Sequence, residues 1–213
     1  MDDGQVGQGQ PLGRLAMDGR PVRRRRRDAS ANRERILRAA DTLLRERGEA
    51  VRMEDVVAAA GVGKGTLYRN YPNRAALAEA LLDDLARDLQ RRTLAEISRG
   101  EAPPLERLDG FMAMAGAFVT DNLGLLCLAR EGRRDDPRLS APYLWQRMVV
   151  AGLLDEAGRG GGGPPPGAGY LPDAILGLID PALVRHGVEN LGLDAAEVIA
   201  AARHAARRMA ATE

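Results

Sequence analysis

The chain has 213 residues, of which 45% are hydrophobic and only 3% are aromatic, and its formal net charge is +1. A single cysteine (Cys127) cannot form an internal disulfide, and two histidines (His186 and His204) are too few for a Cys/His metal cluster, so we expect no metal and no cofactor. No apolar stretch approaches the roughly 20 residues that cross a bilayer, and the polar start lacks the apolar segment of a secretory signal, which predicts a cytoplasmic protein without membrane contact.

Charge is distributed unevenly along the chain. Residues 21–75 carry 14 basic and 7 acidic side chains, a net of +7, whereas residues 76–213 carry 15 and 20, a net of −5. This asymmetry is typical of a protein that presents one end to a polyanion. The chain is rich in Ala, Leu and Arg, which are good helix formers, so we predict an all-α fold.

The first 28 residues are predicted to be a disordered tail with a basic arm. Residues 1–20 are rich in Gly, Gln, Asp and Pro and show no periodicity, so they cannot bury enough surface to offset the entropy of ordering. Five consecutive arginines occupy positions 23–27. Taken alone, they fit an arm that lies along phosphates or in a minor groove, or a solvated run of charge.

Three short helices with tight turns are predicted after this tail. The first starts at Ser30, carries one apolar face and ends at Gly48. The second has the same periodicity and is broken by Gly61-Val62-Gly63. The third runs from Lys64 to about Asn70 and stops before Pro72, because the residue preceding a proline is pushed out of the helical region.

The second and third of these helices have the features of a helix-turn-helix. Ala60 and Gly61 allow the two helices to cross closely, so that the third can project into a major groove about 12 Å wide. Leu67 and Tyr71, four residues apart, are predicted to face the core. The outward positions, most of which carry donors for phosphate oxygens and base edges, are Lys64, Gly65, Thr66, Tyr68, Arg69 and Asn70.

The rest of the chain also follows helical patterns. A long helix is predicted from a cap at Asn73 to about Ser98. Further helices are predicted at 105–121, 123–132, 141–157, 172–188 and 194–210. Residues 158–169 are a Gly- and Pro-rich loop, and Pro181 is expected to kink the helix that contains it.

Several fixed spacings agree with one protein family. Ile-Leu-x-Ala-Ala occupies residues 36–40, Ala-Gly-Val residues 60–62, Lys-Gly-Thr-Leu-Tyr residues 64–68 and Tyr-Pro residues 71–72. Over about residues 32–82 the chain resembles the TetR/AcrR family of helix-turn-helix transcriptional regulators. The resemblance implies a three-helix DNA-binding domain at 29–75 and a helical effector-binding and dimerisation domain at 76–213.

The resemblance also implies roles for single residues. Tyr68, Asn70 and Arg74 match positions that usually contact phosphates, Arg52 and Thr66 match positions that often do, and Lys64 and Arg69 match positions able to reach bases. The chain departs from the usual family pattern at Gly63, Asn70 and Tyr71, which puts the base contacts in doubt more than the fold. Plain packing for Tyr68, and solvated surface charge for Lys64 and Arg69, stay open.

An effector cavity and a dimer are further implications of the resemblance. The large side chains available to a cavity are Phe111, Met114, Phe118, Tyr143, Trp145 and Met148, each of which can equally be ordinary core. In a two-fold dimer the last two helices would pack against their partners through Ile175, Leu176, Ile179, Leu183, Val198, Ile199, Ala202 and Ala206.

The resemblance thus implies a repressor that a small molecule releases from a palindromic, double-stranded DNA operator. Two alternatives stay open: a small-molecule-binding or catalytic helical protein with a vestigial helix-turn-helix, and a DNA-binding regulator with a collapsed pocket.

The segment 61–66 resembles a phosphate-binding loop only superficially, because Ala58 stands where its first glycine belongs and Gly65 follows Lys64. We therefore do not expect an enzyme.

Overall fold

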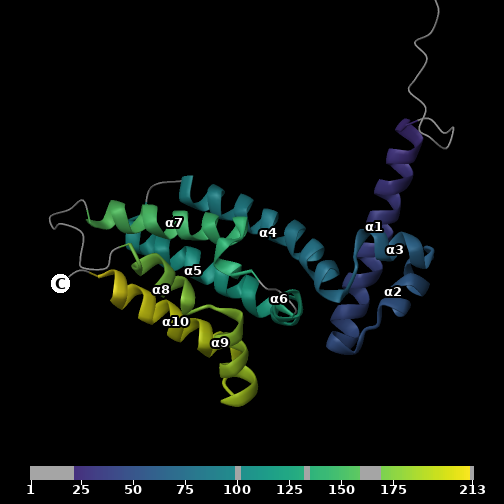
Figure 1. Ribbon diagram of the computed structural model, residues 1–213. Helices are drawn as coiled ribbons and strands as arrows, with labels where there is room; N and C mark the ends of the chain where they lie inside the picture. Colours follow the sequence, from purple (N-terminus) through teal and green to yellow (C-terminus); the bar gives the residue numbers. More distant parts are fainter. Residues whose placement is uncertain (1–21, 99–101, 132–134, 159–168, 212–213) are drawn as a thin grey trace, which may run out of the picture.

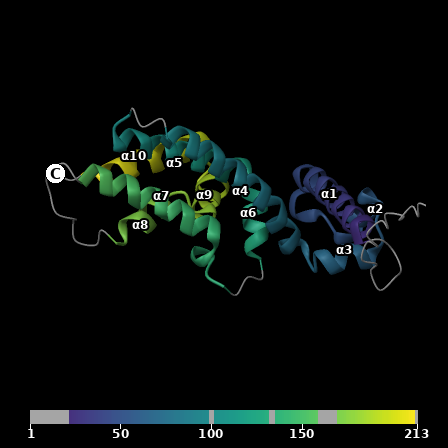
Figure 2. The same ribbon diagram turned by 90° about the horizontal axis from the view of Figure 1, so that it is seen from above.

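The computed structural model describes residues 22–98, 102–131, 135–158 and 169–211. Within these ranges every regular element is a helix and there is no strand, which confirms the all-α prediction. Figure 1 shows an elongated molecule with a small three-helix head at one end, a larger helical body at the other, and the long helix α4 leading from one to the other. The view from above in Figure 2 shows the same separation of head and body.

The head contains α1 (Val22–Arg47), α2 (Met53–Ala60) and α3 (Lys64–Asn70), and α4 (Arg74–Ser98) leaves it. Its core is made by fully buried apolar residues from all four helices, namely Ile36, Ala40, Val56, Leu67 and Leu77. Burial of a large aliphatic side chain contributes about 1.5–3 kcal/mol, so this cluster fixes α3 against α1. The same cluster extends to Leu125 and Leu128 of α6, so a domain boundary at residue 75 remains a proposal.

Helix α1 starts earlier than the sequence pattern indicated. It begins at Val22 instead of Ser30, so residues 23–27 belong to a helix and not to a flexible arm. The physical reason is composition: arginine is a good helix former, and no glycine or proline interrupts residues 22–47. The predicted disordered tail at residues 1–20 lies outside the described residues.

Two predicted helix starts are confirmed by their caps. Asn73 Oδ1 accepts a hydrogen bond from the backbone N–H of Ala76 at 2.9 Å, and α4 begins at the next residue. Asp194 accepts from the N–H of Ala196 at 2.7 Å, and α10 (Ala195–Ala210) follows it. Such caps satisfy backbone donors that a helix leaves without partners at its start, and each contributes about 1 kcal/mol.

The body comprises α5 (Pro104–Asp121), α6 (Leu123–Arg130), α7 (Ala141–Gly158), α8 (Leu171–Gly177), α9 (Pro181–Arg185) and α10. Its core joins apolar residues of α5, α7, α8 and α10, among them Phe111, Met112, Val150, Ile175 and Ile199. In the described part of the chain no single helix is long and apolar enough for a membrane span, and only α5 and α6 reach that length together, across a 75° bend.

The predicted helix at 172–188 is wrong in one respect. Pro181 does not kink a continuous helix; the chain breaks after Gly177, and Pro181 starts the new helix α9. Proline has no N–H to donate and a φ suited to a first helical turn, so it favours a start here. Asp180 caps this start by accepting from the N–H of Ala182 at 2.8 Å.

The residues predicted for a dimer face are mostly interior to the chain itself. Ile175, Leu176, Ile179, Ile199, Ala202 and Ala206 are buried in the body core, whereas Leu183 is 50% exposed. The reason is that α5 lacks bulk where α10 crosses it: a Cβ added to Gly116 would lie 2.6 Å from Ile199 Cγ2. The apolar stripe of α10 therefore fills the groove along α5 in place of a partner's surface.

Candidate nucleic-acid interface

Helices α2 and α3 form the predicted helix-turn-helix. Helix α2 starts after Arg52, whose backbone N–H donates to Asp55 Oδ2 at 3.0 Å. It ends at Gly61, which adopts a left-handed conformation with φ 60° and ψ 40°. The chain then enters α3 from Gly63, so a three-residue turn sets the crossing of the two helices, as the sequence predicted.

An arginine of α1 holds this turn in place. Arg35 Nη2 donates to the carbonyl oxygens of Ala60 and Gly61, at 2.7 Å each. These carbonyls lie at the negative end of α2, where a cation is favoured. Arg35 could not be predicted from the sequence, because its partners lie 25 and 26 residues away and no local pattern links them.

Substitution of Gly61 tests whether the turn between α2 and α3 contributes to stability. We expect Gly61→Ala to lower the free energy of unfolding by about 1–2 kcal/mol, because an L-residue is strained at this φ and its Cβ would lie 2.8 Å from Arg35 Nη2. Gly65→Ala is the matched control, since that glycine is helical and has open space around its Cβ position. Urea denaturation measures both, and equal stability of the two variants would contradict the role given to the turn.

Helix α3 buries one face and exposes the other. Leu67 is 0% and Tyr71 6% exposed, which confirms that both face the core. Lys64, Gly65, Tyr68, Arg69 and Asn70 are exposed, and Thr66 is half-buried. Within the described part of the chain, Lys64 and Arg69 make no ion pair or side-chain hydrogen bond, so both positive charges are available to a ligand.

Two outward side chains have partners inside the head. The Tyr68 hydroxyl donates to Glu54 Oε1 at 3.1 Å, which links α3 to α2. Desolvation and this bond raise the pKa of Tyr68, so its hydroxyl stays a protonated donor. Asn70 Nδ2 donates to the Thr66 carbonyl within α3, at 2.7 Å. Phosphate contacts by these two groups would require the exchange of an existing hydrogen bond.

Arg74 lies at the junction of head and body. It is half-buried, donates to the Val51 carbonyl at 3.4 Å, and forms an ion pair with Glu131 at 3.5 Å. Glu131 follows the end of α6, so this contact joins the start of α4 to the body. Arg52, by contrast, is exposed and lies just before the start of α2.

The body contains a cavity of about 550 Å³ that is partly open to solvent and lies between α4, α5, α6 and α7. Residues within 136–140 and 176–181 complete its lining. Phe118 and Tyr143 line it. The other predicted ligand residues lie elsewhere: Phe111 is 0% exposed and packs edge-on against Trp145 with ring centroids 6.4 Å apart, Met114 is half-buried, and Met148 is 66% exposed. The structure thus brings two of the six to the wall.

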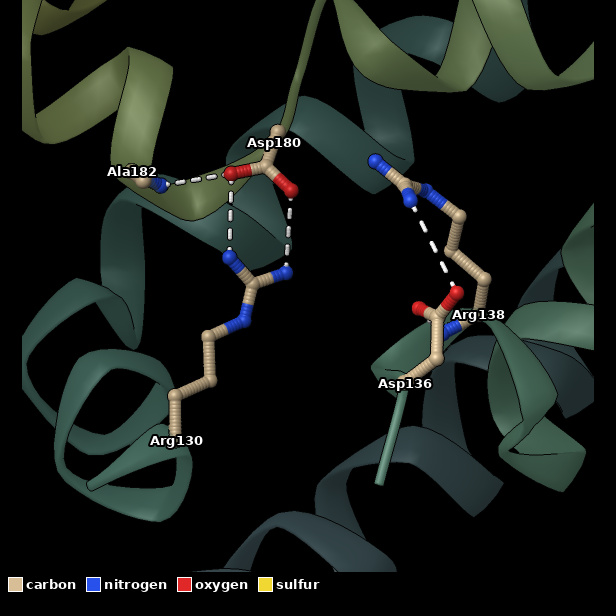
Figure 3. Close-up of polar contacts among 5 residues, drawn as sticks. All are labelled: Arg130, Asp136, Arg138, Asp180 and Ala182. Carbon is tan, nitrogen blue, oxygen red and sulfur yellow. Dashed lines mark hydrogen bonds and ion pairs between the residues drawn. The ribbon is translucent and has the colours of Figure 1, made fainter. Parts of the chain in front are cut away.

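The cavity wall also carries charged groups that were not predicted from the sequence. Arg130 donates to both oxygens of Asp180, at 2.9 and 3.0 Å, as Figure 3 shows. Burial raises the pKa of Asp180, but the bonds from Arg130 and from the Ala182 N–H outweigh it and leave the pKa below its ordinary value. No local signal could have found this pair, because its members lie 50 residues apart.

Tyr143 lines this cavity, but its hydroxyl already has a hydrogen-bond partner outside the cavity lining. The hydroxyl donates to Asp173 Oδ1 at 2.8 Å, and Arg147 donates to the other oxygen of Asp173 at 2.9 Å. Desolvation and the bond to Asp173 raise the pKa of Tyr143 to about 12. Its contribution to a ligand would therefore come from the aromatic ring more than from the hydroxyl.

An all-helical chain with an exposed helix-turn-helix at one end and a cavity in its body defines a two-part helix-turn-helix protein. Residues 36–81, which span most of the head and the start of α4, match the sequence model of the bacterial regulatory proteins, tetR family. The match confirms the resemblance on which the sequence analysis relied.

A curated relative shares part of this sequence, and solved structures share the fold. The chain is 35% identical over 85 residues to the HTH-type transcriptional regulator TtgR of Pseudomonas putida, a match that covers 39% of this chain and 40% of TtgR. A TetR regulator from Haloarcula marismortui has the same fold, with a TM-score of 0.62, 20% identity and coverage of 85% of this chain and 97% of its own. Thermus thermophilus FadR, a TetR-family repressor solved with lauroyl-CoA, gives a TM-score of 0.58, 24% identity and coverage of 85% and 96%.

Proposed function

We propose that this protein is a DNA-binding transcriptional regulator, a repressor that a small-molecule effector releases from a palindromic operator. One observation carries the proposal: Lys64 and Arg69 project from the outer face of α3 without partners in the described part of the chain. Unpaired cations on a projecting helix are the groups that bind phosphates and guanine edges in a major groove. The net charge of +7 over residues 21–75 supports the same surface.

Individual contacts follow from this orientation. Lys64 and Arg69 are proposed to reach bases, and Gly65 to let the backbone approach the duplex closely. The proposed phosphate contacts are Arg52, Thr66, Tyr68, Asn70 and Arg74. Arg74 would have to keep or exchange its ion pair with Glu131, which makes it the proposed contact most closely tied to the body.

A palindromic operator implies a two-fold homodimer, because two heads must address two half-sites. Leu183 of α9 is 50% exposed and is the residue of the predicted dimer face most available to a partner. The stability of such a dimer has to come from this exposed surface, since most of the predicted stripe is already buried within the chain.

Two observations support an effector. The cavity of about 550 Å³ is in the range of small-molecule sites, whereas a regulator with a collapsed pocket would have filled that space. FadR, which shares the fold, was solved with lauroyl-CoA. An effector acts only through its different affinities for the free and the DNA-bound conformations.

Footprinting on DNA upstream of the protein's own and neighbouring genes tests the proposal. We expect a protected palindrome with half-site centres about 10 base pairs or a multiple of that apart. The logarithm of affinity should fall linearly with the logarithm of salt concentration. A vestigial helix-turn-helix on a small-molecule-binding or catalytic protein predicts no protection and no salt-dependent binding, and that result would reject the proposal.

A further inference from the structure

Glu54 of α2 lies against the outward side of α3. Its Oε1 accepts the hydrogen bond from the Tyr68 hydroxyl at 3.1 Å, and Tyr68 is 40% exposed on α3. Lys64 lies four residues before Tyr68, so both side chains lie on the same side of that helix. The carboxylate of Glu54 is therefore part of the surface that faces DNA in the proposed function.

The capping of α2 does not account for this arrangement. The cap is made by Asp55, whose carboxylate accepts from the N–H of Arg52 at 3.0 Å. Glu54 is exposed and forms no ion pair in the described part of the chain. Its second oxygen, Oε2, has no hydrogen-bond partner among the same residues. An acceptor is thus left open on the surface beside Tyr68.

A phosphate is a poor partner for the pair of Glu54 and Tyr68. The Tyr68 hydroxyl has one proton, which it donates to Glu54. A phosphate at this hydroxyl would compete with the carboxylate for that proton and would be repelled by its negative charge. The pair can instead accept from an N–H donor. In the major groove, the bases that offer such a donor are cytosine, through N4, and adenine, through N6.

Cytosine fits a carboxylate better than adenine does. The N6 amine of adenine lies next to N7, which is an acceptor, so adenine suits the side chains that carry both a donor and an acceptor, asparagine and glutamine. A carboxylate has acceptors only, and N7 would repel it. On cytosine the N4 amine is the only polar group in the major groove, and aspartate and glutamate accept from it.

We propose that Glu54 recognises a cytosine in each half-site of the operator by accepting a hydrogen bond from its N4 amine, and that Tyr68 holds the carboxylate in position through its hydroxyl. The inference rests on the proposed function for DNA binding, and it gives Tyr68 a positioning role in place of the phosphate contact proposed above. Base recognition by the head then comes from α2 as well as from α3.

Single base-pair variants of the footprinted operator test the inference. Each position of both half-sites is replaced in turn by the other three base pairs, and fluorescence anisotropy gives the affinity of every duplex for the parent and for Glu54→Ala. At one position per half-site we expect the parent to prefer cytosine by at least about fivefold, and Glu54→Ala to bind all four base pairs within about twofold. If the parent showed no such position, or if Glu54→Ala kept every preference, the proposal would be overturned.

Glu34→Ala is the matched control for charge. Glu34 is an exposed carboxylate on α1, where it pairs with Arg38 of the same helix. Each substitution removes one negative charge from the head, so each should raise the affinity for unrelated duplex by no more than about threefold. Only Glu54→Ala should change the preference for a base. The same change in Glu34→Ala would show that the charge of the head sets the preference, which contradicts an acceptor at Glu54.

Tyr68→Phe distinguishes the positioning role from a phosphate contact. The ring stays and the hydrogen bond to Glu54 is lost, so the preference for cytosine should fall by about threefold at the same position, while the other preferences stay. A hydroxyl that donates to a phosphate predicts an equal loss of affinity for every sequence, and that result would overturn the positioning role. A parent that protects no operator would reject the proposed function. An operator that is bound, but whose cytosine preference survives in Glu54→Ala, would reject this inference alone.

Discussion

Replacement of both unpaired cations of α3, as Lys64→Ala/Arg69→Ala, is expected to lower operator affinity at least about 100-fold at physiological salt. A side chain that reads a base edge contributes roughly 1–3 kcal/mol, and both residues are exposed on one short helix. Affinity is measured by fluorescence anisotropy on the footprinted fragment at several salt concentrations, where any lost phosphate contact also lowers the salt slope by about one.

A second double variant tests whether operator affinity depends on the position of the two cations or only on the net charge of the protein. Arg91→Ala/Arg92→Ala removes the same two charges from α4, where both side chains are exposed and paired with Asp88. We expect this variant to keep operator affinity within about threefold, since these arginines lie in the last third of α4 (Arg74–Ser98), away from the end that leaves the head. An equal loss in both double variants would show that overall charge, and not the face of α3, governs binding.

The helix-turn-helix could be predicted from the sequence because each of its determinants is local. Gly61 supplies the left-handed turn, Pro72 follows the end of α3, and Leu67 with Tyr71 defines the buried face by a spacing of four residues. These signals depend on neighbouring residues only, so they do not depend on how the remainder of the chain packs.

The arrangement of the body could not be predicted in the same way. An apolar stripe such as Ile199, Ala202 and Ala206 shows that one face of α10 is buried, but not whether α5 of the same chain or a partner covers it. The anchor from Arg35 to the α2 turn and the bond from Arg130 to Asp180 join residues 25 and 50 positions apart. Such pairs become visible only when the packing of helices is known.

The two phenylalanines of the chain illustrate the same limit at the cavity. Phe111 and Phe118 are seven residues apart on α5, which places them on nearly the same face, two turns apart. Helical periodicity therefore assigns both to one role. The two side chains nevertheless have different surroundings, because different neighbours pack against the two turns of α5. Phe111 lies against Trp145 in the core, whereas Phe118 lies at the cavity wall.

Phe111→Ala is accordingly expected to lower the free energy of unfolding by about 3–5 kcal/mol, the range for loss of a fully buried phenylalanine. The ring is 0% exposed and also contacts Trp145, the only tryptophan, whose fluorescence reports unfolding in urea. Met148→Ala is the matched control, because that side chain is 66% exposed and should change stability by no more than about 0.5 kcal/mol.

Phe111→Ala and Phe118→Ala together test which of the large side chains bind ligand. Phe111 is absent from the cavity lining, so Phe111→Ala should bind an apolar fluorescent dye that enters the cavity within about threefold of the parent. The assay is run without urea, at a temperature where this variant remains folded. Phe118→Ala, by contrast, removes a wall group and should weaken probe binding more than it weakens folding, because Phe118 is only half-buried. If Phe111→Ala proved as stable as Met148→Ala and lost probe binding instead, the ring of Phe111 would belong to the ligand site and the division between core and cavity along α5 would be wrong.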